Sequence, residues 1–149
     1  MISRSCRQSI GKRLRTALPN PKRQSKHMTD EMQPYLAAMN RMAESVYRFH
    51  ERFEIPSVDT ADVDGTLEAL RQRLALLAEE TGEHARALNR ADIPDACKEA
   101  ADIAYIALGT LLRLGSAGTE AANIVSDKNN LKTPSTHGKR SSTGKVLSK

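Results

Sequence analysis

The chain has 149 residues, enough for one domain with a tail, and its 39% hydrophobic and 3% aromatic content without tryptophan favours packed helices over a β-sandwich. Its net charge of +5 is unevenly distributed, since residues 1–29 hold eight Lys/Arg and no acid, whereas residues 30–125 hold nine Lys/Arg against seventeen Asp/Glu. This acidic body argues against a nucleic-acid-binding core, which needs a clustered basic face, and favours the binding of metal cations.

The cysteines and the hydropathy indicate a cytoplasmic, soluble protein. Cys6 and Cys97 lie far apart and provide neither a disulfide framework nor a metal-ligand spacing, so a reducing compartment is expected. No apolar run reaches the roughly 18 residues that a membrane-spanning helix needs. We therefore expect no membrane partner and no nucleic-acid partner.

Residues 1–29 form an acid-free leader rich in Arg and Ser. This composition is typical of organellar transit peptides and of disordered basic arms. Met28 also opens a plausible start ("MTDEMQPYLAAM"), so translation from an upstream start codon is a third interpretation. We assign residues 1–29 to a basic disordered leader outside the fold, with targeting as the alternative.

The next segments predict two long helices separated by a loop. Apolar residues recur at three- and four-residue steps from Pro34 to Phe53, which predicts the first helix. The stretch "IPSVDTADVDG" follows and is typical of a loop. A second helix is predicted from Thr66 to Asn89, with Asp64 or Thr66 as its N-cap. Its expected core stripe consists of Leu67, Leu70, Leu74, Leu77, Thr81, Ala85 and Leu88.

Two further helices complete an all-α domain over residues 30–128. Asp92 is expected to cap a third helix that runs from Pro94 to Leu114, and a shorter fourth helix covers about 119–128. Residues 129–149 are polar and basic, so this tail is predicted to be loop, hairpin or disorder. The fold class is thus an all-α bundle of four to five helices.

Acidic residues concentrate on the second and third helices. Glu79, Glu80 and Glu83 fall within five positions, and helical spacing places Glu83 on one face with each of the other two. Glu99 and Asp102 share a face of the third helix, where Asp102 is the only charge from Ala100 to Leu112. An ionised carboxylate in such apolar surroundings is costly unless it is paired or binds a metal, so we expect Asp102 to be desolvated.

A short turn between these helices requires antiparallel packing, which can bring Glu80 and Glu83 opposite Glu99 and Asp102. Four converging carboxylates can protonate or hold divalent cations. Ligands that are all oxygen suit Mg²⁺ or Mn²⁺ better than zinc. The alternative is a solvated acidic face without a metal.

These residues resemble the all-α NTP pyrophosphatase superfamily, which comprises the MazG-like and phosphoribosyl-ATP pyrophosphohydrolase-like proteins and the dimeric dUTPases. The family signature has two adjacent glutamates, a third after two spacers, and a later Glu-x-x-Asp. Here it reads "EETGE" (79–83) and "EAAD" (99–102). "FHERFEIP" (49–56) is similar to the family's entry helix, and "NNLK" (129–132) with "GKVLSK" (144–149) to a tail found in one branch.

The resemblance implies a MazG-like, dimeric fold and Mg²⁺-dependent cleavage of a nucleoside triphosphate between its α- and β-phosphates, giving a monophosphate and pyrophosphate. Glu80, Glu83, Glu99 and Asp102 would be the metal ligands, and Glu79 would orient or deprotonate the attacking water. Asn129, Lys132 and Lys145 would contact the substrate, which is a dNTP or phosphoribosyl-ATP. The alternative function is a non-catalytic helical interaction module that kept the fold.

Overall fold

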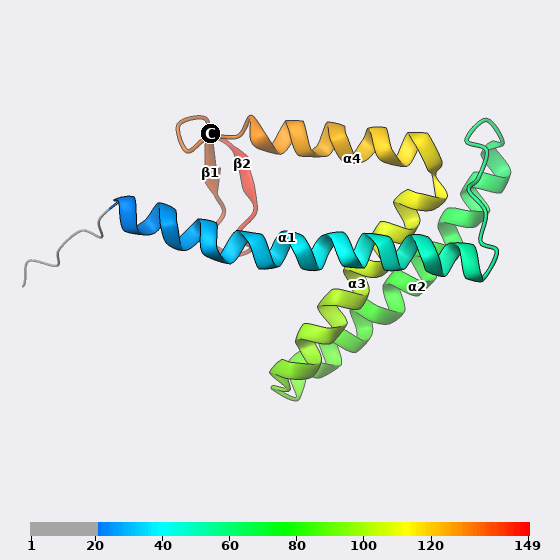
Figure 1. Cartoon of the computed structure of the whole chain (residues 1–149), viewed down its shortest axis with the longest axis horizontal. Helices are drawn as coiled ribbons and strands as arrows, with labels where there is room; N and C mark the ends of the chain where they lie inside the picture. Colours follow the sequence, from blue (N-terminus) through cyan, green and yellow to red (C-terminus); the bar gives the residue numbers. More distant parts are fainter. Residues whose placement is uncertain (1–20) are drawn as a thin grey trace, which may run out of the picture. The chain divides into compact units, whose positions relative to one another are not determined.

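Four helices and a terminal hairpin make up the part of the chain that the computed structural model describes, which is the backbone of residues 21–149 and the side chains of Asp30 and residues 32–149. The elements are α1 (Pro21–Arg52), α2 (Val63–Asn89), α3 (Ile93–Arg113), α4 (Gly115–Asn130), β1 (His137–Lys139) and β2 (Val146–Ser148) (Figure 1). The predicted all-α architecture is confirmed. Within residues 21–149, no helix combines the length and the apolar character needed to cross a membrane.

Helix α1 begins at Pro21 and not at the predicted Pro34, so the predicted helix start was wrong, and residues 21–29 of the expected leader are helical. Proline is favoured at the first helical position, where its missing N–H removes no hydrogen bond, and the following Lys, Gln and Arg residues are good helix formers. Pro34 is accommodated inside the helix. The chain divides into two units, residues 1–38 and 39–149. The predicted disorder of residues 1–20, and Cys6 with it, lies outside the described residues.

Side-chain caps define the starts of α2 and α3. The N-cap of α2 is Asp62, whose Oδ1 accepts a hydrogen bond from the Gly65 amide at 3.1 Å. Neither of the predicted caps of this helix was right, because Asp62 lies in an extended conformation just before the first helical residue and reaches the free amides. The prediction of Asp92 as the α3 cap is confirmed, since its Oδ1 accepts from the Asp95 amide at 3.1 Å.

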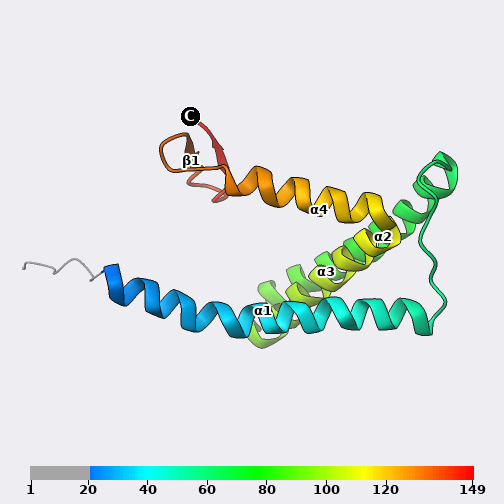
Figure 2. The same cartoon turned by 45° about the horizontal axis from the view of Figure 1, so that its top comes forward.

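Helices α2 and α3 lie antiparallel and side by side, as Figures 1 and 2 show. Small residues form the contact, with Ala69 6%, Ala87 0% and Ala96 5% exposed. The predicted leucine stripe of α2 is largely on the outside: Leu67 is 42%, Leu74 64% and Leu88 52% exposed. The predicted core face of α2 was therefore wrong, because the face that carries alanines lets the two helix backbones approach more closely than leucines would.

Helix α4 follows α3 almost without a break. Gly115 has a φ of +59°, a left-handed conformation that glycine adopts without strain, and it turns the chain directly into α4. The helix therefore begins before the predicted residue 119 and ends at Asn130, past the predicted 128. Gly118 is buried against the Leu111 carbonyl oxygen, where a Cβ would clash with backbone. This close approach fixes how α4 leaves α3.

The second half of α1, from Met39 onward, contributes the largest buried side chain of the described core. Val46 is 2% exposed and His50 6%. The Phe49 ring meets the Tyr105 ring edge-on, with centroids 6.2 Å apart and planes at 87°. The Tyr105 hydroxyl also lies 3.4 Å from Ser45 Oγ. These contacts join α1 to the middle of α3.

The tail adopts the hairpin alternative of its three predicted forms. Strands β1 and β2 pair antiparallel, with Gly138 opposite Leu147. Lys149 Nζ donates to the Pro134 carbonyl oxygen at 2.7 Å and fastens the chain end to the start of the hairpin. Among the described elements, β1 and β2 pack only against each other. The hairpin therefore stands apart from the helices that carry the acidic residues.

Candidate active site

Three carboxylates meet where α2 crosses α3. Glu80, Glu83 and Glu99 each offer a carboxylate oxygen, and these oxygens all lie within 4.8 Å of one another. The antiparallel packing through Ala87 and Ala96 brings them together, because it faces the second half of α2 with the first half of α3. The Nδ1 of His84 donates to the Ala96 carbonyl oxygen across the two helices at 2.9 Å and fixes their alignment at this level.

The pKa of Glu80 records this crowding. Burial raises the pKa of the Glu80 carboxyl, and the negative charges of Asp102, Glu83, Glu99 and Glu79 raise it further. Among these charges, that of Asp102 on the facing helix raises the pKa of Glu80 most. A divalent cation would relieve this repulsion.

Asp102 and Glu79 lie at the edge of the cluster. Neither belongs to the group of converging oxygens, and both side chains are exposed. The expectation that Asp102 is desolvated was wrong, because its side of α3 opens to solvent beyond the contact with α2.

Among the residues that the structure describes, Arg86 is the cation that touches the cluster. Arg86 Nη2 lies 2.9 Å from Glu83 Oε1, in a pair whose side chains are 60% and 44% exposed. Ion pairs this exposed contribute about 0–1 kcal/mol, so Arg86 does not neutralise the site strongly. Three acidic oxygens within coordination reach, one of them on a carboxyl whose pKa is raised, fit a hard divalent cation.

The structure does not bring the predicted tail residues to these carboxylates. Asn129 and Lys132 line a cavity of about 490 Å³ whose walls come from residues 129–146 alone. Lys132 Nζ donates to Asn129 Oδ1 at 2.7 Å. Lys145 is exposed on the hairpin outside that cavity. Asn129 and Lys132 thus lie together, whereas Lys145 lies apart from them on the hairpin.

Sequence reasoning missed a basic pocket between α1 and α3, which we call the arginine pocket. It has a volume of about 370 Å³ and is lined by Arg41, Glu44, Ser45, Arg48, Phe49, Arg52 and Tyr105. Tyr105 is one helical turn beyond Asp102, so the pocket adjoins the acidic cluster along α3. The arginines are spaced so that they share one face of α1, and this pattern could have indicated the pocket. Without knowledge of the α1–α3 contact, however, the same pattern is typical of an ordinary solvent-exposed helix face.

A protein-family model described as phosphoribosyl-ATP pyrophosphohydrolase matches residues 46–129, which is more than half of the chain and includes all five residues Glu79, Glu80, Glu83, Glu99 and Asp102. The chain belongs to this family. The family is one of nucleotide pyrophosphohydrolases, enzymes that act on phosphoric anhydrides. The predicted resemblance is confirmed. Searches of curated proteins and of solved structures returned no match.

The family match also separates parts of the molecule. It contains Phe49 and Tyr105 of the arginine pocket and ends at Asn129, so the hairpin lies beyond it. The acidic cluster thus lies inside the matched region.

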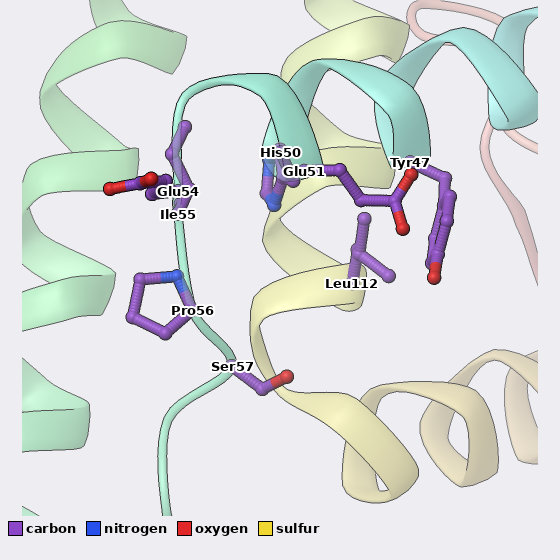
Figure 3. Close-up of a pocket in the computed structure, with 8 residues that line it drawn as sticks. All are labelled: Tyr47, His50, Glu51, Glu54, Ile55, Pro56, Ser57 and Leu112. Carbon is purple, nitrogen blue, oxygen red and sulfur yellow. The ribbon is translucent and has the colours of Figure 1, made fainter.

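A second cavity, of about 360 Å³, lies between the end of α1, the following loop and α3 (Figure 3). The ring of His50 borders it, with Ile55, Pro56 and Leu112 nearby. Burial lowers the pKa of His50, and the positive charges of Arg73 on α2 and Arg113 on α3 lower it further. No carboxylate of the acidic cluster lines this cavity, so His50 is a packing residue.

His50 should make stability depend on pH. Because its pKa is lower in the folded protein than the ordinary 6.5, the unfolded chain binds the proton more tightly, and stability should fall as the pH drops below about 6.5. The His50→Gln variant should lose part of this dependence. Thermal unfolding of both proteins between pH 5 and pH 8 measures it, and parallel curves would contradict the assignment.

Proposed function

We propose that the protein is a Mg²⁺-dependent nucleoside triphosphate pyrophosphohydrolase, with Mn²⁺ as a substitute metal. It cleaves the bond between the α- and β-phosphates and releases a nucleoside monophosphate and pyrophosphate. The observation that carries the proposal is the convergence of Glu80, Glu83 and Glu99 in a chain of the pyrophosphohydrolase family.

Glu80, Glu83 and Glu99 would hold the metal, with Asp102 completing the set from the edge of the cluster. Carboxylate oxygens are the ligands that Mg²⁺ and Mn²⁺ prefer. The bound ion would supply positive charge against the phosphates and lower the pKa of a water molecule. Arg86 pairs with Glu83 only weakly, so a bound divalent ion would displace it from that carboxylate.

Glu79 would orient the attacking water and accept its proton. It neighbours the ligand Glu80 in sequence but is exposed and lies outside the converging oxygens, so its carboxylate remains available as a base. Deprotonation of the water would generate the nucleophile that attacks the α-phosphorus atom, and pyrophosphate would leave.

The arginine pocket would bind the rest of the nucleotide. Its three arginines outnumber its single glutamate, which suits phosphate groups, and Phe49 and Tyr105 offer aromatic surface to a base. A substrate lying along α3 from this pocket would place its phosphates beside Asp102. A dNTP or phosphoribosyl-ATP is the proposed substrate, and a homodimer, covering the exposed leucines of α2, is the proposed assembly.

Replacement of Arg48 by glutamine should raise the KM for the triphosphate about tenfold with little change in kcat, because one charged contact with the substrate is lost. Arg71→Gln is the matched control. Both arginines are exposed and pair with a glutamate on their own helix, but Arg71 does not line the pocket. Steady-state kinetics of the two variants provide the test, and equal KM values would remove Arg48 from the substrate site.

A screen of ribo- and deoxyribonucleoside triphosphates and phosphoribosyl-ATP, each with Mg²⁺ or Mn²⁺, tests the function. Monophosphate and pyrophosphate should appear in equal amounts, and chelation of the metal should stop the reaction. Release of orthophosphate and a diphosphate would show cleavage at a different bond. Activity that persists in a chelator would contradict the role of the acidic cluster.

A further inference from the structure

We propose that Arg73 and Arg113, which we call the guanidinium pair, form a binding site for a small phosphate-class anion where α1, α2 and α3 meet. The site is separate from the acidic cluster and from the arginine pocket, and it does not depend on the proposed reaction. Three observations carry the proposal: the convergence of the two cations, the lack of a carboxylate partner for them among the described residues, and their unused hydrogen-bond donors.

Packing between the helices brings the two guanidinium groups to one face of α3. Arg73, on α2, donates from Nη2 to the Ile106 carbonyl oxygen at 2.8 Å and from Nε to Thr110 Oγ1 at 3.3 Å. Arg113 follows Thr110 by three residues, so it emerges on the same face of α3. The missing side chain of Gly109 makes room for Arg73, because a Cβ there would lie 2.6 Å from Arg73 Nη2. The fold thus holds two cationic side chains against neighbouring turns of α3.

The guanidinium pair has no counter-charge in the part of the chain that the structure describes. Four other arginines of the described helices pair with a carboxylate, whereas neither Arg73 nor Arg113 does. Burial lowers the pKa of Arg73, and the positive charge of Arg113 lowers it further. His50, whose Nε2 would lie 3.1 Å from a Cβ at Gly109, supplies no negative charge either. Partly desolvated like charges without a partner are costly, so a bound anion would stabilise the pair.

The unused N–H groups of the pair suit an oxyanion. A guanidinium carries five N–H donors, and Arg73 uses two of its own within the protein. Arg113 Nε is buried and has no hydrogen-bond partner among the described residues. Both residues are half-buried, so they remain within reach of a dissolved ion. A phosphate dianion matches the charge of two guanidinium groups and offers them several acceptor oxygens, whereas chloride carries a single charge and no oxygen.

The guanidinium pair lies apart from the site of the proposed reaction. Arg73 precedes Glu80 by seven residues, which is about two turns or 10 Å along α2. This distance exceeds the Debye length of about 8 Å at physiological salt, so the acidic cluster repels an anion at the pair only weakly. The residues that line the arginine pocket do not include Arg73 or Arg113. A phosphate can therefore bind here while the acidic cluster is free of metal.

Titration calorimetry with inorganic phosphate in the presence of a chelator tests the proposal, because the metal-free acidic cluster repels an anion. Arg73→Gln and Arg113→Gln should each weaken phosphate binding at least about tenfold relative to the wild type, since one charged contact is lost. Arg71→Gln, which removes an exposed arginine of α2 outside the pair, is the matched control and should bind phosphate as the wild type does. Equal affinities in all four proteins, or no binding by the wild type, would overturn the proposal.

Gly109→Ala separates the position of Arg73 from its charge. The new Cβ would push the Arg73 guanidinium away from α3, so phosphate binding should weaken although both cations are kept. Thermal unfolding without phosphate checks that each variant is folded. Wild-type affinity in a folded Gly109→Ala protein would contradict the proposed geometry. Phosphate binding that is lost in Arg48→Gln would assign the anion to the arginine pocket and overturn the proposal.

A second titration, with a nucleoside monophosphate, distinguishes the two sources of such an anion. Binding that Arg113→Gln weakens identifies a site for phosphate esters, whereas binding of inorganic phosphate alone identifies a site for the free ion. A dimer in sedimentation that Arg113→Gln dissociates and phosphate leaves unchanged would assign the counter-charge to a carboxylate of a second copy, against the proposal. None of these measurements requires turnover, so failure of the proposed reaction would leave their result unaffected.

Discussion

Glu80→Gln is expected to abolish pyrophosphate release while making the metal-free protein more resistant to heat. The variant removes one negatively charged oxygen from the proposed metal ligands. This should lower kcat by about 100-fold or more, as is typical when one group that stabilises the charge of the transition state is removed. The removal of this charge should also increase the stability of the metal-free protein, because Asp102, Glu83 and Glu99 repel the charged Glu80 carboxylate. Function and stability should thus move in opposite directions.

The pH dependence of stability separates this effect from simple misfolding. The pKa of Glu80 is raised above its ordinary 4.5, so the folded protein binds that proton more tightly than the unfolded chain does. The stability that this provides is present below pH 4.5 and is lost as the pH rises through the raised pKa. The Glu80→Gln variant should lack this loss, and Mg²⁺ should raise its melting temperature less than that of the wild type.

Glu120→Gln is the control for both measurements, since Glu120 is an exposed carboxylate on α4 outside the cluster. It should keep wild-type activity and the wild-type response to Mg²⁺. Calorimetry with and without Mg²⁺, together with the pyrophosphate assay, provides the comparison. A Glu80→Gln protein that is active, or that Mg²⁺ stabilises as much as the wild type, would remove Glu80 from the ligand set.

Gly118→Ala is expected to destabilise the fold by about 3 kcal/mol, the upper end of the range for overpacking, because the new methyl group would clash with the backbone carbonyl of Leu111. A flexible side chain could move aside, but the Leu111 carbonyl belongs to the last turns of α3 and is held by the helix. Relief therefore requires α4 to shift relative to α3. Chemical denaturation measures the loss.

Gly82→Ala is the matched control. Gly82 also lies inside a helix, but its new Cβ would meet only the end of the Arg86 side chain, at an ordinary 3.5 Å. Alanine favours the helix over glycine by up to about 1 kcal/mol, so this variant should be as stable as the wild type or more so. Equal losses in both variants would show that the α3–α4 contact is not the cause.

Local chemistry explains which parts of the fold could be predicted. Asp92, followed by Pro94 in the first turn, marks the start of α3 in the sequence itself, and the structure places the cap there. The packed face of α2 could not be predicted in this way. That helix carries both a leucine face and an alanine face, and either could pack against another helix. The position of the partner helix determines which face is buried, and in the structure it is the alanine face, since Ala87 is 0% exposed.

The same division holds for the candidate site. The spacing of Glu80, Glu83 and Glu99 was enough to predict that they meet, because two antiparallel helices leave few other arrangements. The exposure of Asp102 depends on where α3 leaves α2, and the arginine pocket depends on how α1 crosses α3. Neither is encoded in a local pattern, so both required the tertiary structure.

The contact between Arg86 and Glu83 has a consequence for metal uptake. Entry of the proposed divalent ion at Glu83 would exchange one positive partner for another, so the net gain in free energy would be smaller than the attraction of the carboxylates alone would give. Because a pair this exposed contributes only about 0–1 kcal/mol, Arg86 would raise the metal concentration that fills the centre by a modest factor. A neutral residue at position 86 would shift that threshold downward without altering any ligand.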